Sequence, residues 1–483
     1  MRLTPAVSGR VTATNNAGFT SKEVARSDLI VDVAPSLGLS LVGANYALEG
    51  SLGLDAVTYA GNEQPSEIFP RARLAFRSNP VERFFYLDAS VDATTTTNDP
   101  FAARIDASSP YAPQAVTQYA MHVSPYVQAR PLPNLRFLAR SDNDWIRRQN
   151  GAAASSTIDR DVRFQRNVVR LEREPVPFGV LAEVTSEDTR YASQSEAALS
   201  LDAARVGVNY MLDPQLVLGL ILGREHSAFA LTDDYDSIRG VSLRWTPTER
   251  TNFSVLSEKR FFGRGWEAAF AHRSPLLAIS AAWRRRPITD PVSLGVAPAG
   301  SDLAALLDSI LTTRIPNDAD RARAVQDYLQ KRNLPSTLTE AVEVLGQTAR
   351  LNEAGSVTMA LMGARQLVSF TLFRQRDTDL RRANQTSLVV SADESRQYGG
   401  SILYSRQLTP QRTFEAIATG VATNGQGLRL GDYTRDWSLM LMLTEALTPR
   451  SNVTLGFNRQ LVRSNVVTST QETRIFVGGS HRF

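Results

Sequence analysis

Apolar and polar residues alternate along many stretches of the chain. In the last stretch, Gln471 to Phe483, counting back in twos from Phe483 gives a largely apolar register, His481, Gly479, Val477 and Ile475, between residues that are mostly polar. An extended strand turns alternate side chains to opposite faces, so such a segment can present one side to hydrocarbon and the other to water. An ordinary edge strand at the end of a soluble sheet is the alternative for this stretch alone.

The alternation recurs in pairs of stretches joined by tight turns. Asp28 to Val42 and Asn45 to Tyr59 reverse at Gly43-Ala44-Asn45, and later hairpins turn at Thr-Pro pairs such as Thr448-Pro449. Proline sets the backbone angle of a tight turn and cannot donate into a sheet. Longer polar loops separate the hairpins, for example Thr94 to Thr117. Short turns on one edge and long loops on the other predict a single closed antiparallel transmembrane β-barrel over residues 1–483, with about 18–22 strands.

One segment, residues 298–350, departs from this period. Leu303, Leu306, Leu307, Ile310 and Leu311 follow helical spacing after a possible cap at Ser301. A second helix is expected from Asn317 to Lys331, and a third from the capping-box pattern Thr337 to Glu340. Counting turns and loops places this insertion on the long-loop edge, where it is expected to narrow or plug the lumen. A cap over the outside and a position in the periplasm are the alternatives.

Composition excludes other classes. No run of about eighteen apolar residues is present, which excludes a membrane protein built from helices. The absence of cysteine suits an exported protein and a cytosolic one equally. The start, Met1 to Ser8, lacks the apolar core of a signal peptide, so an exported protein with this start is expected to be a mature chain.

Basic charge comes almost entirely from arginine. All but three of the 53 basic residues are arginines, the exceptions being Lys22, Lys259 and Lys331, and they alternate with acids along many strands. Guanidinium groups pair bidentately with carboxylates, which favours fixed ladders on a water-filled surface. A nucleic-acid reader would cluster its cations with aromatic residues on one element, so we expect no nucleic-acid partner.

These patterns give two sets of site candidates. The inward-facing positions expected to line a polar lumen are Arg73, Asp88, Arg170, Glu183, Arg244 and Glu267. Tryptophans near predicted strand ends, expected at the membrane interfaces, are Trp245, Trp266, Trp283 and Trp437. Core aromatics of a soluble β-domain are the alternative for the tryptophans.

Chemical motifs are scarce. The four histidines are scattered on different predicted strands, and the pair Glu225-His226 with the acids Asp233, Asp234 and Asp236 is better explained as isolated surface residues than as a hydrolytic or calcium site. No glycine-rich phosphate loop and no Gly-x-Ser-x-Gly elbow is present. We therefore expect no enzyme activity and no metal or other cofactor.

The end of the chain resembles the closing strand of bacterial outer-membrane β-barrels, which typically ends in Phe, here Phe483; His481 departs from the usual bulky apolar residue. Together with the Val11–Asn16 opening, Asp28-Leu29-Ile30 and the Ser356–Arg365 hairpin, it resembles the outer-membrane barrel proteins of exopolysaccharide export systems, including those associated with PEP-CTERM sorting.

This resemblance implies a passive conduit in the outer membrane of a Gram-negative bacterium. The conduit would contact outer-membrane lipid and lipopolysaccharide, pass a secreted polysaccharide, and work with periplasmic and inner-membrane export components. A general or small-solute diffusion porin of the same fold is the alternative function. The resemblance implies no catalytic residue.

Overall fold

The computed structural model describes residues 2–97, 99–104, 115–150, 161–191, 197–229, 232–288, 303–331, 334, 350–380 and 394–483. Its two helices are α1 (Leu303–Leu311) and α2 (Asp318–Lys331), and a short 3-10 turn, η1, spans Gly427–Arg429. The strands are β1 Arg2–Thr14, β2 Asp28–Val42, β3 Tyr46–Tyr59, β4 Glu67–Val81, β5 Phe85–Thr97, β6 Ala115–Leu132, β7 Leu135–Asn150, β8 Asp161–Arg173, β9 Phe178–Tyr191, β10 Ala197–Asp213, β11 Leu216–Phe229, β12 Thr232–Thr248, β13 Thr251–Arg260, β14 Gly263–Arg273, β15 Leu277–Pro287, β16 Arg350–Met362, β17 Gln366–Asp379, β18 Ser395–Gln407, β19 Arg412–Gly425, β20 Tyr433–Thr448, β21 Ser451–Ser464 and β22 Thr470–Arg482.

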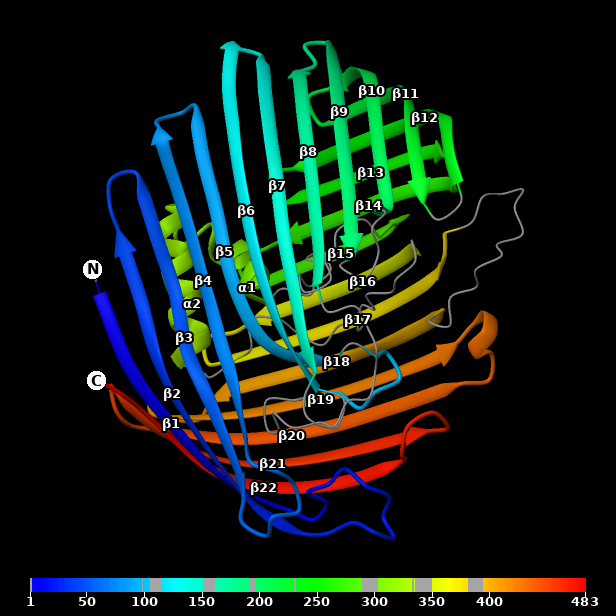
Figure 1. Cartoon of the computed structure of the whole chain (residues 1–483). Helices are drawn as coiled ribbons and strands as arrows, with labels where there is room; N and C mark the ends of the chain where they lie inside the picture. Colours follow the sequence, from blue (N-terminus) through cyan, green and yellow to red (C-terminus); the bar gives the residue numbers. More distant parts are fainter. Residues whose placement is uncertain are drawn as a thin grey trace.

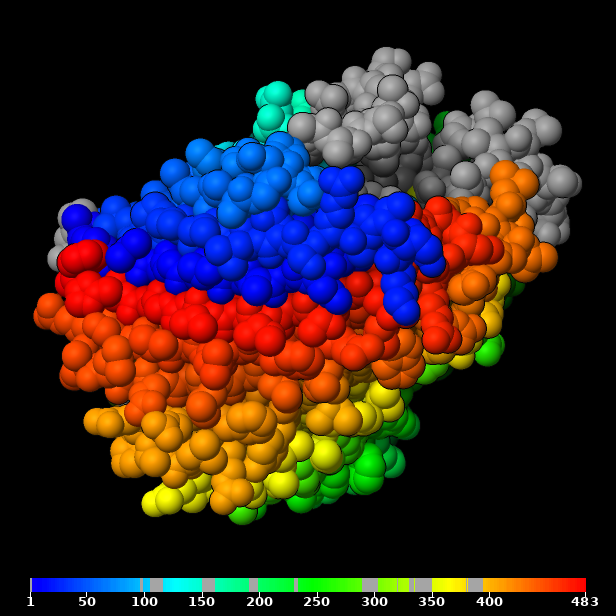
Figure 2. Space-filling model, turned by 90° about the horizontal axis from the view of Figure 1, so that it is seen from below, coloured from blue at the N-terminus to red at the C-terminus, as the bar shows by residue number. Residues whose placement is uncertain are grey.

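Twenty-two antiparallel strands form one sheet in which each strand pairs with its neighbours along the chain. The sheet closes on itself because β1 pairs with β22, from Ala6 opposite Arg482 to Thr14 opposite Arg474. Figure 1 shows the resulting ring of strands, and in Figure 2 the N-terminal strands lie directly against the C-terminal ones. Closure leaves no unpaired sheet edge, which a wall in hydrocarbon requires. The predicted closed antiparallel barrel of 18–22 strands is confirmed.

The connections are sorted between the two edges of the barrel, as predicted. Strands β2 and β3 are joined by residues 43–45 and strands β20 and β21 by residues 449–450, on what we call the short-turn edge. The longer connections, residues 15–27, 98–114 and 288–349, link strands that end and begin at the other edge, which we call the long-loop edge. The hairpin of β13 and β14 is an exception, because only Phe261 and Phe262 join these strands at the long-loop edge.

The outer face of the wall is apolar and the inner face polar. On β11 the side chains of Leu218, Leu220 and Leu222 are 41%, 66% and 60% exposed, whereas Glu225 on the other face is buried. In the closing strand β22, Ile475 and Val477 lie on the outer face and Arg474 and Phe476 are buried inside, which confirms the alternation read from the sequence. Exposed leucine and valine around a closed ring require a hydrocarbon solvent.

The largest buried apolar cluster lies inside the barrel and is formed by the helical insertion. Its helical members are Leu303, Leu306, Leu307, Ile310, Leu311, Val325 and Leu329, and its wall members are Ala278, Ala360, Met362, Leu367 and Leu403. No helix among the described residues is long and apolar enough to cross a membrane. The contacts with these five wall residues place α1 and α2 on the inner wall of β15 to β18 (Figure 1).

Candidate functional site in the lumen

The inner wall carries opposite charges on neighbouring strands. Arg10 lies 2.7 Å from Asp32 across β1 and β2, and Arg73 lies 3.5 Å from Asp92 across β4 and β5. These pairs arise because the strand register sets an arginine opposite an acid on the same face. Cross-strand pairs of this kind hold long side chains against the wall and keep it polar.

Ion pairs that link four strands, β8, β9, β10 and β13, show how dense this network is. Arg205 on β10 lies 3.6 Å from Glu183 on β9 and 3.2 Å from Glu258 on β13, and Arg170 on β8 lies 3.7 Å from the same Glu183. Arg205 and Glu258 are mostly buried, with side chains 12% and 7% exposed. One arginine thus bridges two acids.

Four of the six lumen candidates line one cavity of about 650 Å³. Arg170, Glu183, Arg244 and Glu267 border it, on strands β8 to β14. Arg73 and Asp88 lie elsewhere, on the same inner face of β4 and β5, where Asp88 stands opposite Arg77 in the ladder. The structure thus places all six on the inner face and brings four together; their role as a substrate-facing wall remains a prediction.

Glu225 and His226 point to opposite faces of the wall. Glu225 is buried inside, where Arg260 donates to it at 2.7 Å and the Phe261 amide at 2.7 Å. His226 lies outside, with its imidazole 2.6 Å from Asp233 and stacked on Tyr235. Because their side chains lie on opposite faces of the wall, Glu225 and His226 do not form one site. Among the described residues, no group of three or more His, Asp or Glu side chains could hold a metal ion.

Helices α1 and α2 lie in the lumen and reach the short-turn edge, although β15 ends and β16 begins at the long-loop edge. The helices' contacts Ala278, Met362 and Leu367 lie at strand ends on the short-turn edge, and Arg314 donates to the carbonyl of Pro275 in the turn between β14 and β15. The described helices therefore lie inside the barrel and not over its outside. That they plug the lumen remains a prediction. The predicted cap at Ser301 and the third helix from Thr337 lie outside the described residues.

Polar contacts fix the two helices against each other. The guanidinium of Arg321 on α2 donates to Asp308 on α1 and to Asp318, both at 2.8 Å, and to the carbonyl of Ile315 at 3.1 Å. The hydrogen bond that Arg321 donates to Asp308 raises the pKa of Arg321, so this arginine stays charged. Asn317 accepts from the Asp320 amide at 3.0 Å and caps α2, which begins one residue later than predicted.

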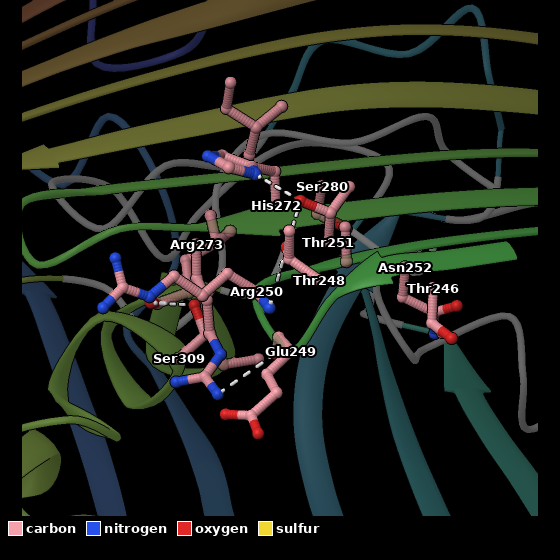
Figure 3. A pocket seen from close by; sticks show the side chains of 14 residues that line it. Thr246, Thr248, Glu249, Arg250, Thr251, Asn252, His272, Arg273, Ser280 and Ser309 are labelled. Carbon is pink, nitrogen blue, oxygen red and sulfur yellow. Dashed lines mark hydrogen bonds between the residues drawn. The ribbon is translucent and has the colours of Figure 1, made fainter. Parts of the chain in front are cut away.

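A cavity of about 470 Å³ remains between α1 and the wall at the short-turn edge. It is bordered by Leu306 and Ser309 of the helix and by the ends of β12 to β15, including Thr248, Asn252 and Ser280 (Figure 3). Arg273 donates to the carbonyl of Glu249 across its rim at 3.3 Å. The helix therefore does not fill the lumen completely at this edge.

A second segment folds into the barrel and was not predicted. Residues 99–104, between β5 and β6, lie on the inner wall of β19 to β21, where Thr434 donates to the carbonyl of Phe101 at 2.9 Å and the Arg104 amide donates to Asp436 at 2.9 Å. Phe101 is fully buried and stacks on the guanidinium of Arg429 at 3.8 Å. The sequence signal for this contact was one aromatic residue within a polar loop.

The four tryptophans of the sequence analysis lie on the outer face. Trp245, Trp283 and Trp437 are 46%, 40% and 63% exposed, and Trp266 holds the guanidinium of Arg285 at 5.3 Å from its ring. Trp245 lies toward the short-turn edge and the other three toward the long-loop edge. Their assignment to two interface belts remains a prediction.

A closed ring of strands, an apolar outer band and a polar interior define a transmembrane β-barrel of the outer-membrane type. Such a barrel belongs in the outer membrane of a Gram-negative bacterium, the location predicted from the sequence.

Comparisons with known proteins agree with this class. The structure is similar to the FrpB iron transporter from Neisseria meningitidis, with a TM-score of 0.50, 10% identity, and coverage of 100% of this chain and 83% of that chain. Also similar are the ferric-catecholate import receptor Fiu from E. coli K12 (TM-score 0.47, 9% identity, 99% and 81% coverage) and OccK5 from Pseudomonas aeruginosa (0.33, 11%, 100% and 98%). No family model and no curated protein matches the sequence. At 10% identity the likeness to FrpB shows the fold alone, and it does not single out the exopolysaccharide-associated proteins.

Proposed function

We propose that this protein is an outer-membrane channel, without enzyme activity, that exports a polysaccharide through its polar lumen. The observation that carries the proposal is the charged inner wall of a large barrel whose lumen is obstructed by a helical insertion. The resemblance to exopolysaccharide export proteins points to the same function. The periplasmic and inner-membrane export components that this resemblance implies are part of the proposal.

The chemistry of the wall suits a hydrated polymer. The cavity that borders Arg170 and Glu183 is lined by seven arginines and five glutamates. Sugar hydroxyls need both donors and acceptors along their path, and the alternating pairs supply both. Because guanidinium groups bind carboxylates and phosphates bidentately, an acidic polymer would be favoured over a neutral one.

We expect the insertion to keep such a wide barrel from leaking. Side chains alone do not fill the interior of a barrel of this strand number. The helices are held by apolar contacts to β15 to β18 and reach the short-turn edge, which faces the periplasm in barrels with this arrangement. An export partner docking from the periplasm would meet α1 and α2 directly and could displace them.

Planar-bilayer recordings test the obstruction. The isolated protein is expected to conduct few ions, and a variant with a short Gly-Ser turn in place of residues 298–349 is expected to conduct steadily. The Gln326→Ala variant, changed at an exposed position of α2, serves as control and should remain quiet. Steady conductance of the unmodified protein would instead favour a diffusion porin.

Secretion tests the substrate. A strain without the protein is expected to lose surface polysaccharide and to recover it when the gene is restored. Unchanged surface polysaccharide would refute export, whatever the bilayer recordings show.

A further inference from the structure

On the outer face near the long-loop edge, cations stand directly opposite cations. Arg239 on β12 pairs with Lys259 on β13, and Lys259 pairs in turn with Arg264 on β14. All three side chains are exposed. Within the described residues none of the three forms a salt bridge. We call Arg239, Lys259 and Arg264 the outer cation row.

The row lies just beyond the apolar band. Arg239 stands opposite Leu222, which is 60% exposed on the outer face, and Val241, two residues along the same face, is 55% exposed. Trp266 follows Arg264 by two residues on the same face of β14 and holds Arg285 against its ring. The row therefore sits where the hydrocarbon band ends and the polar headgroups of the outer leaflet begin.

Like charges directly opposite on a sheet are destabilising, so this arrangement needs a physical reason. Opposite charges face each other at other positions: Arg205 stands opposite Glu183 on the inner wall, and on the outer face at the short-turn edge Arg412 lies 2.7 Å from Glu445. On the outer face at the long-loop edge, cations stand opposite cations at three further places. The further directly opposed cations are Arg163 with Arg190, Arg376 with Arg396, and Arg435 with Arg463.

We propose that the outer cation row binds the phosphate groups of a phosphorylated glycolipid of the outer leaflet. A phosphate between two opposed cations removes their repulsion and accepts charge-assisted hydrogen bonds from both. The acyl chains of such a lipid would lie along Leu222 and Val241 below the row. Because an apolar band adjoins the cations, the site fits a lipid headgroup and not a free anion.

The test compares lipids that differ in phosphate and proteins that differ at the row. The purified protein is mixed with lipid A that carries both phosphates, with the same lipid after dephosphorylation, and with phosphatidylglycerol. Bound lipid is measured by native mass spectrometry, and unfolding by the heat-induced mobility shift in gels. The variants are Arg239→Gln/Lys259→Gln/Arg264→Gln and, as matched control, Arg173→Gln/Arg406→Gln/Arg412→Gln, three exposed outward cations at the short-turn edge.

The protein and the control variant are expected to bind phosphorylated lipid A in preference to the other two lipids, and the row variant to bind it at least about tenfold more weakly. In detergent without lipid the row variant should unfold at the same or a higher temperature, because repulsion has been removed. Lys259→Glu, which offers both neighbours an ion pair, should act in the same two directions.

Three results would overturn the proposal. They are equal binding of the phosphorylated and dephosphorylated lipids, equal binding of phosphatidylglycerol, and equal affinity of the row variant and the control. Displacement of lipid A by free inorganic phosphate would also overturn it, since a bare anion would then suffice. None of these results depends on whether the protein exports a polysaccharide.

Discussion

Leu307 holds the helical insertion in the lumen, and shortening it should release the insertion without unfolding the wall. Its side chain is fully buried, as are Leu303 on the preceding turn and Ala360 and Leu403 on the wall. Leu307→Ala removes apolar volume at the contact between helix and wall. The wall itself is held by ladder hydrogen bonds that do not involve this side chain.

The size of the effect follows from cavity formation. Replacing a buried leucine by alanine typically costs about 2–5 kcal/mol, because transfer energy is lost and the site collapses only partly. If about 3 kcal/mol of this falls on docking, the undocked population rises roughly 100-fold, since each 1.4 kcal/mol is a factor of ten. Apolar burial of the five large side chains of α1 contributes roughly 8–15 kcal/mol before entropy is subtracted, so the docked form should remain the major one.

Single-channel recording measures this directly, as the fraction of time that the channel conducts. Leu307→Ala should raise that fraction strongly, whereas Gln326→Ala should leave it unchanged, and the heat-induced gel shift of the barrel should stay at its original temperature. An unchanged open fraction would show that the insertion does not control permeation. A gel shift that fell to a much lower temperature would show that helices and wall unfold together, against a separable plug.

Three further predictions concern the wall and the second inward segment. Arg205→Gln leaves Glu183 and Glu258 without their bridging cation. Introduced into the conducting variant that lacks residues 298–349, it should make the channel more cation-selective, measured as a shift of the reversal potential in a salt gradient. No shift would mean that ions do not pass this wall. Phe101→Ala removes a fully buried ring, and should cost roughly 3–5 kcal/mol of local stability, seen as faster hydrogen exchange in residues 99–104, whereas Phe84→Ala at an exposed turn should not; equal rates would contradict the packing. Ile475→Arg places a charge on the lipid face and should lower the free energy of unfolding in lipid by about 2–4 kcal/mol if it sits near the midplane; unchanged stability would mean that β22 does not face hydrocarbon there.

Much of the fold could be predicted because it depends on local alternation. Ile475 and Val477 lie on the outer face since a strand can only alternate its side chains, and the leucines of α1 lie together because helical spacing brings them to one side. Strand β14 is short, and it forms because both neighbouring strands pair with it along most of its length. Strand parity also placed the insertion at the correct edge.

The contacts inside the lumen could not be predicted in the same way. Residues 99–104 contact strands β19 to β21, more than three hundred residues away in the chain, mainly through backbone carbonyls. A polar loop gives no periodic signal for such contacts. The sequence also did not show which acid each inward-facing arginine would pair with. Arg73 pairs with Asp92, and Asp88 stands opposite Arg77. The turn sets this register of the hairpin, and composition does not reveal it.

The place where the insertion leaves the wall has an evolutionary consequence. The strands that bear it, β15 and β16, are themselves neighbours, paired without interruption from Leu277 opposite Leu361 to Pro287 opposite Leu351. The helical insertion is therefore an addition to a hairpin that is complete without it. Evolution can lengthen, exchange or remove the insertion, and so change the substrate, without altering the strand pairing of the barrel.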